Sequence, residues 1–533
     1  MNRSRWYRVF PPRSALFPSF LSGVLLLLAF PPYSVPGIAA VALVPLLVAL
    51  VRRRYTRAES FRAGFFCGAT FFILLLWWIK DLLPWANVTI PWLMTPALIL
   101  LVLYLALYPA FFCLLLRVIS GGRRGLALAT APALWTLLEM VRSRGEIGFP
   151  WGVVGYSLSD FPRMIQSASI AGVFGLSFII LASNSFFAAA ISVRGAARRA
   201  LLAAAGIVIL LANAMVGNAL MPRENETPVH ETARIAVIQP DIDLQIKWNQ
   251  AYTDSIFRLY EQLARKLKPL EPELYVFPET AAPVYIRYES RYRRRLIRLA
   301  LDLGSPVYIG YLDARRDSRT NELNVFNAAG LFAADGTLSQ QYEKVHLLPF
   351  GEALPLSWRF PILKKINFGQ GNFQPGTVLD PITAGTRKFG TLICFESIFP
   401  GLSRRYVRQG VDFLVNITND GWFGDTPGPV QHAQMCIMRT VENRRSLVRS
   451  ANTGISMVVD PWGRIVSSLG LDRMGTLVEP VIVLRERTIY SRTGDVPVAS
   501  FSLVIVVLAL LRTLIRRRSP SGPTNADATR NRT

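Results

Sequence analysis

The sequence has few of the residues on which structural disulfides and metal centres depend. Its 533 residues include four cysteines and three histidines, and no CxxC pair occurs. Disulfide-rich scaffolds and zinc fingers are therefore excluded, and we expect neither a metal ion nor a cofactor. Cys67 and Cys113 lie in apolar runs, where a thiol is most simply a small packing group. Cys394 and Cys436 could pair in an oxidising compartment, but the bond would remove the only good nucleophile.

Acidic residues are also scarce. The chain has 35 Asp and Glu against 59 Lys and Arg, which gives a net charge of +24. Such a balance is typical of nucleic-acid-binding proteins. However, much of the arginine stands in short loops between apolar stretches, and we find no zinc-finger spacing, no RNP-type motif and no P-loop. We therefore interpret the positive charge as a determinant of membrane topology and expect no nucleic-acid partner.

Long apolar runs are what the chain has instead. Hydrophobic residues make up 51% of the sequence and the mean hydropathy is +0.31, as in integral membrane proteins. Apolar stretches lie at about 14–30, 37–51, 63–80, 91–117, 126–142, 168–192, 199–220 and 497–515. We predict eight transmembrane helices. The first follows Arg3, Arg5 and Arg8 like a signal peptide, but no clear cleavage site ends it, so we expect it to be retained.

Arginine clusters occur in alternate loops and predict the orientation. They lie at 3–13, 52–62, 117–124, 194–199 and 512–518. The intervening loops are nearly free of Lys and Arg. By the positive-inside rule, this alternation requires an even number of spans and places both termini in the cytoplasm. The long segment before the last span then lies outside the cytoplasm.

That segment has the pattern of an α/β domain. Apolar, β-rich runs at 233–239, 274–277, 307–311, 325–332, 390–394, 413–416 and 456–459 predict strands, and 253–268 has helical spacing. We predict a membrane domain at 1–221 with helices one to seven and an extracytoplasmic α/β domain at 222–495. The eighth transmembrane helix follows at 496–518, and a disordered cytoplasmic tail at 519–533.

Three chemically complementary residues each follow a predicted strand. Glu279 ends one apolar run and Cys394 ends another, whereas Lys344 follows the more polar segment 338–343. A carboxylate, an ammonium and a thiol can perform acyl transfer, with Glu279 as general base and Cys394 as nucleophile. Lys344 and the Phe395 backbone N–H would stabilise the oxyanion. The predicted helix at 402–408 could favour the thiolate.

Plainer alternatives exist for each of these residues. Cys394 could be a buried structural thiol, and Glu279 and Lys344 a surface ion pair. The order and context of all three favour catalysis. His346 and His432 could suggest a Cys–His dyad, but without an orienting asparagine context we interpret both as structural.

The order Glu279, Lys344, Cys394 resembles the catalytic triad of the nitrilase, or carbon–nitrogen hydrolase, superfamily, which implies an αββα sandwich. The motifs FPET at 277–280, KVHLLPFGE at 344–352, NDGWF at 419–423, GFPW at 148–151 and GYS at 155–157 resemble the apolipoprotein N-acyltransferases. This resemblance covers nearly the whole chain, including the membrane helices.

The resemblance implies roles for further residues. Glu352 matches an additional acid that orients Lys344 or assists the base. Glu396 matches an important acid two places beyond the nucleophile, and Trp248 matches a mobile-loop tryptophan that engages substrate. Phe395 stands where the family has tyrosine, so it keeps the ring and loses the hydroxyl. Glu352 could instead be a surface carboxylate, and Trp248 a packing residue.

The implied activity is the last step of bacterial lipoprotein maturation. An acyl chain would pass from a membrane phospholipid, with phosphatidylethanolamine as the expected donor, through a Cys394 thioester to the N-terminal amine of a diacylglyceryl-apolipoprotein. The implied location is the cell inner membrane, with the catalytic domain in the periplasm. Two alternatives are a membrane-anchored amidase of small C–N substrates and a transporter or scaffold with an inactive outer domain.

Overall fold

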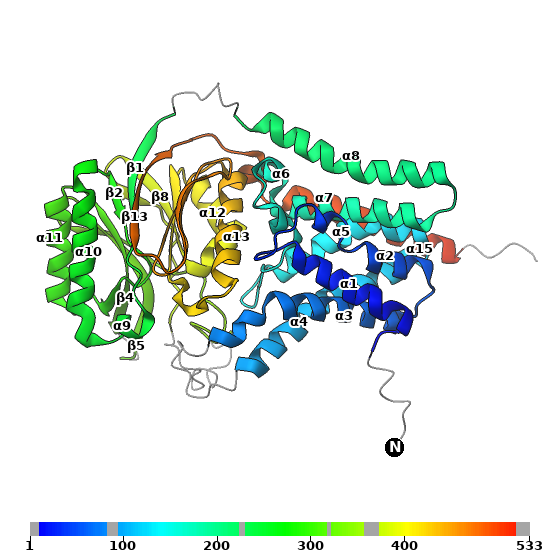
Figure 1. Ribbon diagram of the computed structural model, residues 1–533, viewed down its shortest axis with the longest axis horizontal. Helices are drawn as coiled ribbons and strands as arrows, with labels where there is room; N and C mark the ends of the chain where they lie inside the picture. Colours follow the sequence, from blue (N-terminus) through cyan, green and yellow to red (C-terminus); the bar gives the residue numbers. More distant parts are fainter. Residues whose placement is uncertain (1–9, 83–93, 223–229, 317–320, 356–372, 519–533) are drawn as a thin grey trace, which may run out of the picture.

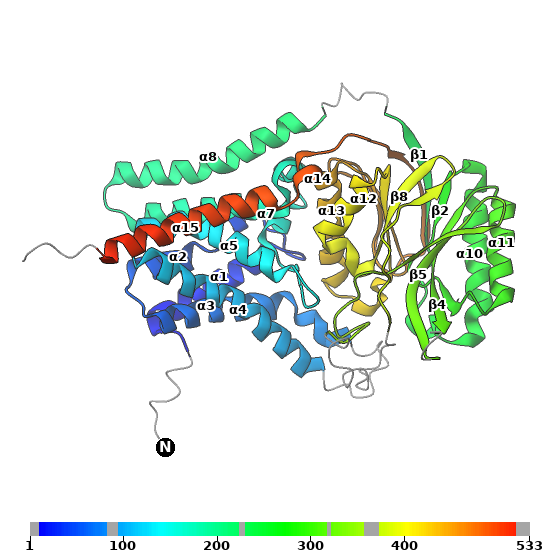
Figure 2. The ribbon, with the colours of Figure 1, turned by 180° about the vertical axis from the view of Figure 1, so that it is seen from behind.

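The computed structural model describes residues 10–82, 94–222, 230–316, 321–355 and 373–518 of the chain. They form a bundle of long helices on one side and a domain of two sheets covered by helices on the other (Figures 1 and 2). The two ends of the chain, residues 1–9 and the predicted tail at 519–533, lie outside the described residues.

Eight helices of the bundle correspond to the eight predicted apolar stretches. They are α1 (Arg13–Leu28), α2 (Val44–Arg52), α3 (Arg57–Leu75), α4 (Met94–Ser120), α5 (Arg124–Arg142), α7 (Ala168–Ser192), α8 (Ala196–Leu220) and α15 (Val496–Arg518). By length and composition, five of the described helices, α3, α4, α7, α8 and α15, can cross a membrane. The bundle therefore fits a membrane protein, whereas the number of eight spans stays a prediction.

Helix α3 begins six residues before the predicted stretch because of its N-terminal cap. The Thr56 hydroxyl accepts a hydrogen bond from the Glu59 N–H at 3.2 Å, and the Glu59 carboxylate accepts one from the Thr56 N–H at 2.7 Å. This reciprocal capping box satisfies two N–H groups that a helix start otherwise leaves open. The polar first turn therefore belongs to the helix although it is not apolar.

The other domain contains two sheets. The seven-stranded sheet has the order β13-β1-β2-β4-β5-β6 with β3 beside β4, and the six-stranded sheet has the order β12-β11-β10-β9-β8-β7. The strands are β1 (Thr232–Gln239), β2 (Leu274–Val276), β3 (Ala282–Tyr285), β4 (Val307–Arg316), β5 (Leu323–Phe332), β6 (Leu338–Glu343), β7 (Ile382–Ala384), β8 (Arg387–Ile393), β9 (Phe413–Thr418), β10 (Leu447–Ala451), β11 (Ser456–Val459), β12 (Ile465–Leu469) and β13 (Gly475–Ile482).

Helices cover the outer face of each sheet. Helices α10 (Thr253–Leu267) and α11 (Ser290–Leu303) lie against the first sheet, and α12 (Pro400–Arg408) and α13 (Gly428–Asn443) against the second (Figure 1). The short helices α6 (Pro162–Ile165), α9 (Leu244–Lys247) and α14 (Ile489–Thr493) complete the described α-helices. The layers thus run helix, sheet, sheet, helix, and the predicted αββα sandwich is confirmed.

Parallel strands at the centre of each sheet bring their carboxyl ends to one edge. In the second sheet β8, β9 and β10 run parallel, with Ile393 paired to Ile417 and Leu447 to Leu414. In the first sheet β2 runs parallel to β1 and β4. Central parallel strands are buried on both faces, which is why β9 has no exposed residue. Within each sheet, the residues that follow neighbouring parallel strands are therefore close in space.

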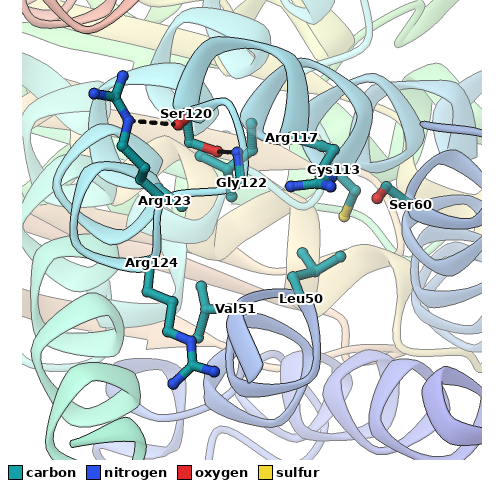
Figure 3. A pocket seen from close by; sticks show the side chains of 11 residues that line it. Leu50, Val51, Ser60, Cys113, Arg117, Ser120, Gly122, Arg123 and Arg124 are labelled. Atoms are coloured by element: carbon teal, nitrogen blue, oxygen red, sulfur yellow. Dashed lines mark hydrogen bonds between the residues drawn. The ribbon is translucent and has the colours of Figure 1, made fainter. Parts of the chain in front are cut away.

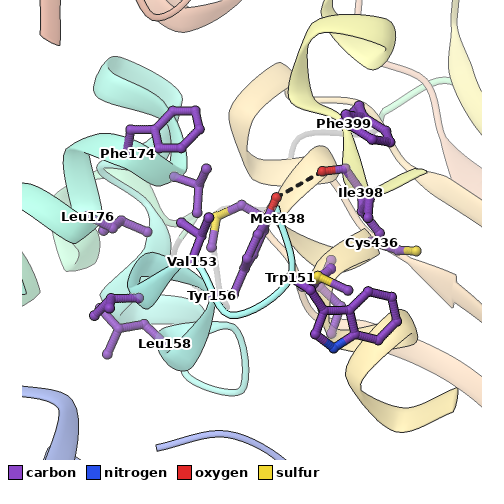
Figure 4. Close-up of a cluster of buried hydrophobic side chains, with 14 of the residues drawn as sticks. Trp151, Val153, Tyr156, Leu158, Phe174, Leu176, Ile398, Phe399, Cys436 and Met438 are labelled. Atoms are coloured by element: carbon purple, nitrogen blue, oxygen red, sulfur yellow. Dashed lines mark hydrogen bonds between the residues drawn. The ribbon is translucent and has the colours of Figure 1, made fainter. Parts of the chain in front are cut away.

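The loop between α5 and α7 packs the bundle against the sandwich. Trp151, Val153 and Tyr156 come from this loop and meet Ile398 and Met438 of the sandwich (Figure 4). The Tyr156 hydroxyl donates a hydrogen bond to the Ile398 carbonyl at 3.1 Å. The two motifs GFPW and GYS thus form the contact between the domains.

Buried polar groups reinforce the same contact. The Gln431 side-chain oxygen on α13 accepts hydrogen bonds from the indole N–H groups of Trp151 at 2.7 Å and Trp78 at 3.2 Å. Arg439, also on α13, donates to the Tyr156 hydroxyl at 3.1 Å and pairs with Glu442 at 3.1 Å. A fully buried arginine is tolerated only with such partners. The contact is therefore specific as well as apolar.

Candidate active site

Cys394 lies directly after β8, at the start of a helical turn, η9 (Cys394–Ile398). Its backbone φ is +51°, in the left-handed region that residues other than glycine seldom adopt. The sharp turn places Cys394 at the strand end, where the residue is partly buried. All four cysteines are free, so Cys394 and Cys436 are not joined.

Glu279 follows β2 and is held by two hydrogen bonds. Its Oε1 atom accepts one from the Asn327 side-chain amide at 2.7 Å, and Oε2 accepts one from the Asn419 backbone N–H at 2.8 Å. The side chain is buried. Asn327 lies in β5 and Asn419 lies in the loop after β9. The two sheets of the sandwich therefore fix the carboxylate in one orientation.

Lys344 follows β6 and lies between two carboxylates. Its Nζ atom is 2.7 Å from Oε2 of Glu352 and 3.8 Å from Oε1 of Glu279. The Asn327 amide also donates to Oε1 of Glu352 at 2.9 Å, so one amide joins both acids. The Leu348 N–H donates to Glu352 at 2.8 Å. This geometry supports the predicted orienting role of Glu352.

The charges of this cluster keep Lys344 protonated. Burial by itself would lower the pKa of Lys344, but Glu352 and Glu279 outweigh it and raise the pKa above its ordinary value. Burial raises the pKa of Glu279, Lys344 opposes this effect, and Glu352 adds to it. Lys344 is therefore an ammonium near neutral pH.

The Cys394 thiol is neutral at rest. Burial raises its pKa, the Glu279 charge raises it further, and Lys344 only partly opposes them. The predicted thiolate-favouring effect of a following helix is thus outweighed by burial. The nucleophile must lose its proton as it attacks, which requires a base beside it. Glu279 is close enough to act electrostatically on the thiol.

Glu396 joins the turn of the nucleophile to the loop that carries Lys344. Its carboxylate accepts hydrogen bonds from the N–H groups of Ile393 at 2.7 Å, Val345 at 2.8 Å and His346 at 3.0 Å. The Tyr342 hydroxyl donates to it at 2.9 Å. Burial raises the pKa of Glu396 to about 7. The acid predicted to be important therefore positions the site and does not face the thiol.

Phe395 and Trp248 have different surroundings. Phe395 is buried, with its ring 5.2 Å from that of Phe399 and 6.1 Å from that of Phe149. Its backbone N–H belongs to the first turn of η9, where such groups lack a partner within the helix. Trp248 ends α9 and is 41% exposed, so it lies at the surface next to the buried site.

A second network of hydrogen bonds, around His432, lies under the nucleophile. The sequence analysis predicts that this histidine is structural. The His432 Nδ1 atom is 3.0 Å from Asp420, and Nε2 is 3.2 Å from the Cys394 carbonyl oxygen. Arg449 donates to the other Asp420 oxygen at 2.6 Å. Both ring nitrogens are thus engaged with groups other than the thiol. The network holds the turn and is no Cys–His dyad.

Within the described part of the chain, side chains of this network also lie near enough to one another to be considered as ligands of a metal ion. Ligand atoms of Cys394, Asp420 and His432 lie within 4.8 Å of one another. However, Asp420 already binds His432 and the fully buried Arg449. A cation would have to displace that guanidinium, so these residues do not fit a resident metal.

Lys247 is a functional candidate that the sequence analysis missed. Its side chain is buried, and its Nζ atom donates to the Glu279 backbone carbonyl at 3.0 Å. Burial lowers the pKa of Lys247 to about 7, although Glu279 partly opposes the shift. Its ammonium in turn lowers the pKa of Glu279. The only signal in the sequence was its place beside Trp248.

Replacement of Lys247 by methionine should change the pH dependence of activity. Glu279 must be a carboxylate to accept a proton, so activity falls as the pH drops through its pKa. Because Lys344 and Glu352 remain, loss of the Lys247 charge leaves their effects in place and raises the pKa of Glu279. The acid limb of the kcat/KM profile should therefore move to higher pH, while the plateau above it stays close to wild type.

The matched control is Lys266→Met, which removes an exposed lysine of α10. Its profile should coincide with that of the wild type. A Lys247→Met profile of unchanged position but reduced height would show that Lys247 only supports packing, and would contradict the electrostatic role.

Family comparisons agree with this geometry. Residues 22–186 match the model of the apolipoprotein N-acyltransferase N-terminal domain, and residues 234–483 match that of the carbon–nitrogen hydrolases. An apolipoprotein N-acyltransferase of Geobacter metallireducens is 37% identical over 489 residues, which cover 91% of this chain and 92% of that protein. The chain belongs to the apolipoprotein N-acyltransferase family.

A second relative has the same name. An apolipoprotein N-acyltransferase of Rhodopseudomonas palustris is 30% identical and covers 94% of this chain and 95% of its own length. Among solved structures, an amidase from Nesterenkonia sp. AN1 is 20% identical, with a TM-score of 0.37, over 48% of this chain and 92% of its own. The predicted membership of a nitrilase-superfamily acyltransferase family is confirmed.

Proposed function

We propose that this apolipoprotein N-acyltransferase moves an acyl chain from a membrane phospholipid, through a thioester on Cys394, to the N-terminal α-amine of a diacylglyceryl-modified lipoprotein. The observation that carries the proposal is the buried cluster of Glu279, Lys344 and Glu352 beside the Cys394 turn, which packs on the apolar helix bundle. The catalytic residues are Glu279, Lys344 and Cys394.

The first half-reaction forms the thioester. As the Cys394 sulfur attacks the ester carbonyl, Glu279 takes its proton. Lys344 and the Phe395 N–H stabilise the negative oxygen of the tetrahedral adduct. The adduct then expels the lysophospholipid alkoxide, which receives the proton from Glu279. The acyl chain remains on sulfur.

The second half-reaction forms the amide. The acceptor α-amine, with an ordinary pKa of about 7.7–8.0, has a useful neutral fraction near neutral pH. It attacks the thioester carbonyl and gives a proton to Glu279, and the departing Cys394 sulfur recovers that proton. The two substrates share one site in turn, so ping-pong kinetics are expected.

The proposed location supplies both lipids. We place the protein in the cell inner membrane with both termini cytoplasmic, eight spans, and the domain at 222–495 in the periplasm, as the arginine pattern supports. A site outside the cytoplasm has no acyl-CoA, so the ester of a phospholipid, phosphatidylethanolamine in the first place, serves as donor. The membrane domain at 1–221, with 496–518, brings these lipids to the sandwich, and the tail at 519–533 stays cytoplasmic.

The test follows a labelled acyl chain. Purified protein is incubated with phospholipid labelled in its acyl chain, and hydroxylamine-labile label is expected on Cys394. Addition of a diacylated lipopeptide should discharge the label as an amide. Discharge to water, with equal turnover of small amides, would favour the amidase alternative. Active protein that never carries label would contradict the thioester.

A further inference from the structure

A pocket with a basic lining lies at the end of the helix bundle far from the sandwich. It is a small hollow of about 20 Å³ that opens to solvent, where α4 ends and α5 begins. Arg117, Arg123 and Arg124 line it, together with Leu50 and Val51 of α2 (Figure 3). Cys394 lies at the opposite end of the bundle, so this pocket is separate from the proposed acyl-transfer site.

The lining has positive charge and no carboxylate. Three of its 11 residues are arginines, and none is Asp or Glu. Ion pairs elsewhere in the described chain neutralise clustered arginines, as Asp254 and Glu261 do for Arg295. Positive groups gathered in a concave site without such partners attract an anion from outside the protein.

Arg117 is fixed with its terminal nitrogens toward the pocket. Its Nε atom donates to the Tyr55 carbonyl at 2.9 Å. The guanidinium lies against Gly122, where a Cβ atom would stand 1.8 Å from Nη1 (Figure 3). Gly122 also has a φ of +79°. This left-handed φ favours glycine in the turn between α4 and α5, against which the Arg117 side chain lies.

Arg123 adds a buried donor without an acceptor. Its Nε atom donates to the Ser120 carbonyl at 3.2 Å, and Nη2 donates to the Thr513 hydroxyl. Within the described residues, its buried Nη1 has no hydrogen-bond partner. An unsatisfied buried N–H is costly, and an oxygen ligand would remove the cost. Guanidinium groups fit phosphate oxygens well.

We propose that this pocket binds the phosphate of an anionic phospholipid headgroup. The helices α3 and α4 that border it have the length and composition of membrane spans, so the pocket lies where headgroups lie. Leu50, Val51 and Leu116 add apolar surface to the lining. The acyl chains of a lipid can contact this surface, whereas free phosphate cannot. Basic pockets between membrane helices commonly take anionic headgroups. The bound lipid is not the acyl donor.

The experiment measures lipid retention by the full-length protein. Native mass spectrometry compares phosphatidylglycerol with phosphatidylcholine of the same chains, and a third arm adds inorganic phosphate alone. The wild type should retain phosphatidylglycerol about tenfold more than Arg117→Gln/Arg124→Gln does. The control Arg53→Gln/Arg54→Gln removes the same charge from exposed residues outside the pocket and should behave as the wild type.

Two readouts keep the result interpretable. Labelling of Cys394 from phospholipid should persist in both double variants, which would show that they fold. The single variant Arg124→Gln, at an exposed residue, should lose part of the retention of phosphatidylglycerol. Equal retention by the two double variants would overturn the proposal. Equal binding of phosphatidylcholine, or displacement of the lipid by inorganic phosphate alone, would overturn it as well. Loss of Cys394 labelling with lipid retention intact would instead count against the proposed function.

Discussion

Cys394→Ala should form no acyl-enzyme and should lose activity by at least about four orders of magnitude. Every bond change of the proposed reaction passes through this sulfur, and loss of a nucleophile typically costs that much or more. The measurement is hydroxylamine-labile acyl label on the purified variant, together with amide formation on a diacylated lipopeptide. Alanine fits the left-handed φ of +51° no worse than cysteine does, so the turn should survive.

The matched control for this variant is Cys67→Ala. Cys67 is buried in α3, away from the sandwich, and serves packing. It should retain wild-type labelling. Acyl transfer by Cys394→Ala at a measurable fraction of the wild-type rate would place the nucleophile elsewhere and contradict the mechanism.

Lys344→Met should lower the rate by about 10²–10³-fold or more. Loss of one donor to the oxyanion costs about 3 kcal/mol. The structure adds a second effect, because the variant leaves Glu279 and Glu352 buried together without their cation. The pKa of Glu279 then rises further, and a protonated base cannot accept the thiol proton. Single-turnover acylation of Cys394, followed across pH, measures both effects.

A double variant separates charge balance from catalysis. Lys344→Met/Glu352→Gln removes one positive and one negative group, so the remaining Glu279 is no longer beside a second carboxylate. Thermal stability should recover relative to Lys344→Met, because an unpaired buried charge is lost. Acylation should not recover, because the oxyanion still lacks its cation. Recovered acylation would show that Lys344 only balances charge.

Much of the site was predictable because strand ends and motifs are local signals. The run before Cys394 is apolar and stops at the thiol, and β8 ends there as predicted. Glu279 and Lys344 likewise follow β2 and β6, although the polar residues of β6 gave no strand pattern. However, β2 and β8 belong to different sheets and β6 is antiparallel to β5, so these three ends meet only because the two sheets pack face to face.

Other supporting residues, such as Asn327 and Lys247, could not be predicted, because they depend on contacts between distant parts of the chain. Asn327 is one polar residue in β5, and nothing local shows that its amide joins Glu279 and Glu352. Arg449 interrupts β10 with a charge, so that buried strand has no apolar run. Strand β13 pairs with β1 across more than two hundred residues. Only the folded chain shows these contacts.

The hydrogen bond from Tyr156 to Ile398 connects the bundle with the sandwich four residues after the nucleophile. A helix bundle tilts when the bilayer around it becomes thicker or thinner. Because Tyr156 belongs to the bundle and Ile398 to the turn of Cys394, such a tilt pulls directly on that turn. We therefore expect the placement of the sulfur to depend on the thickness of the surrounding lipid layer.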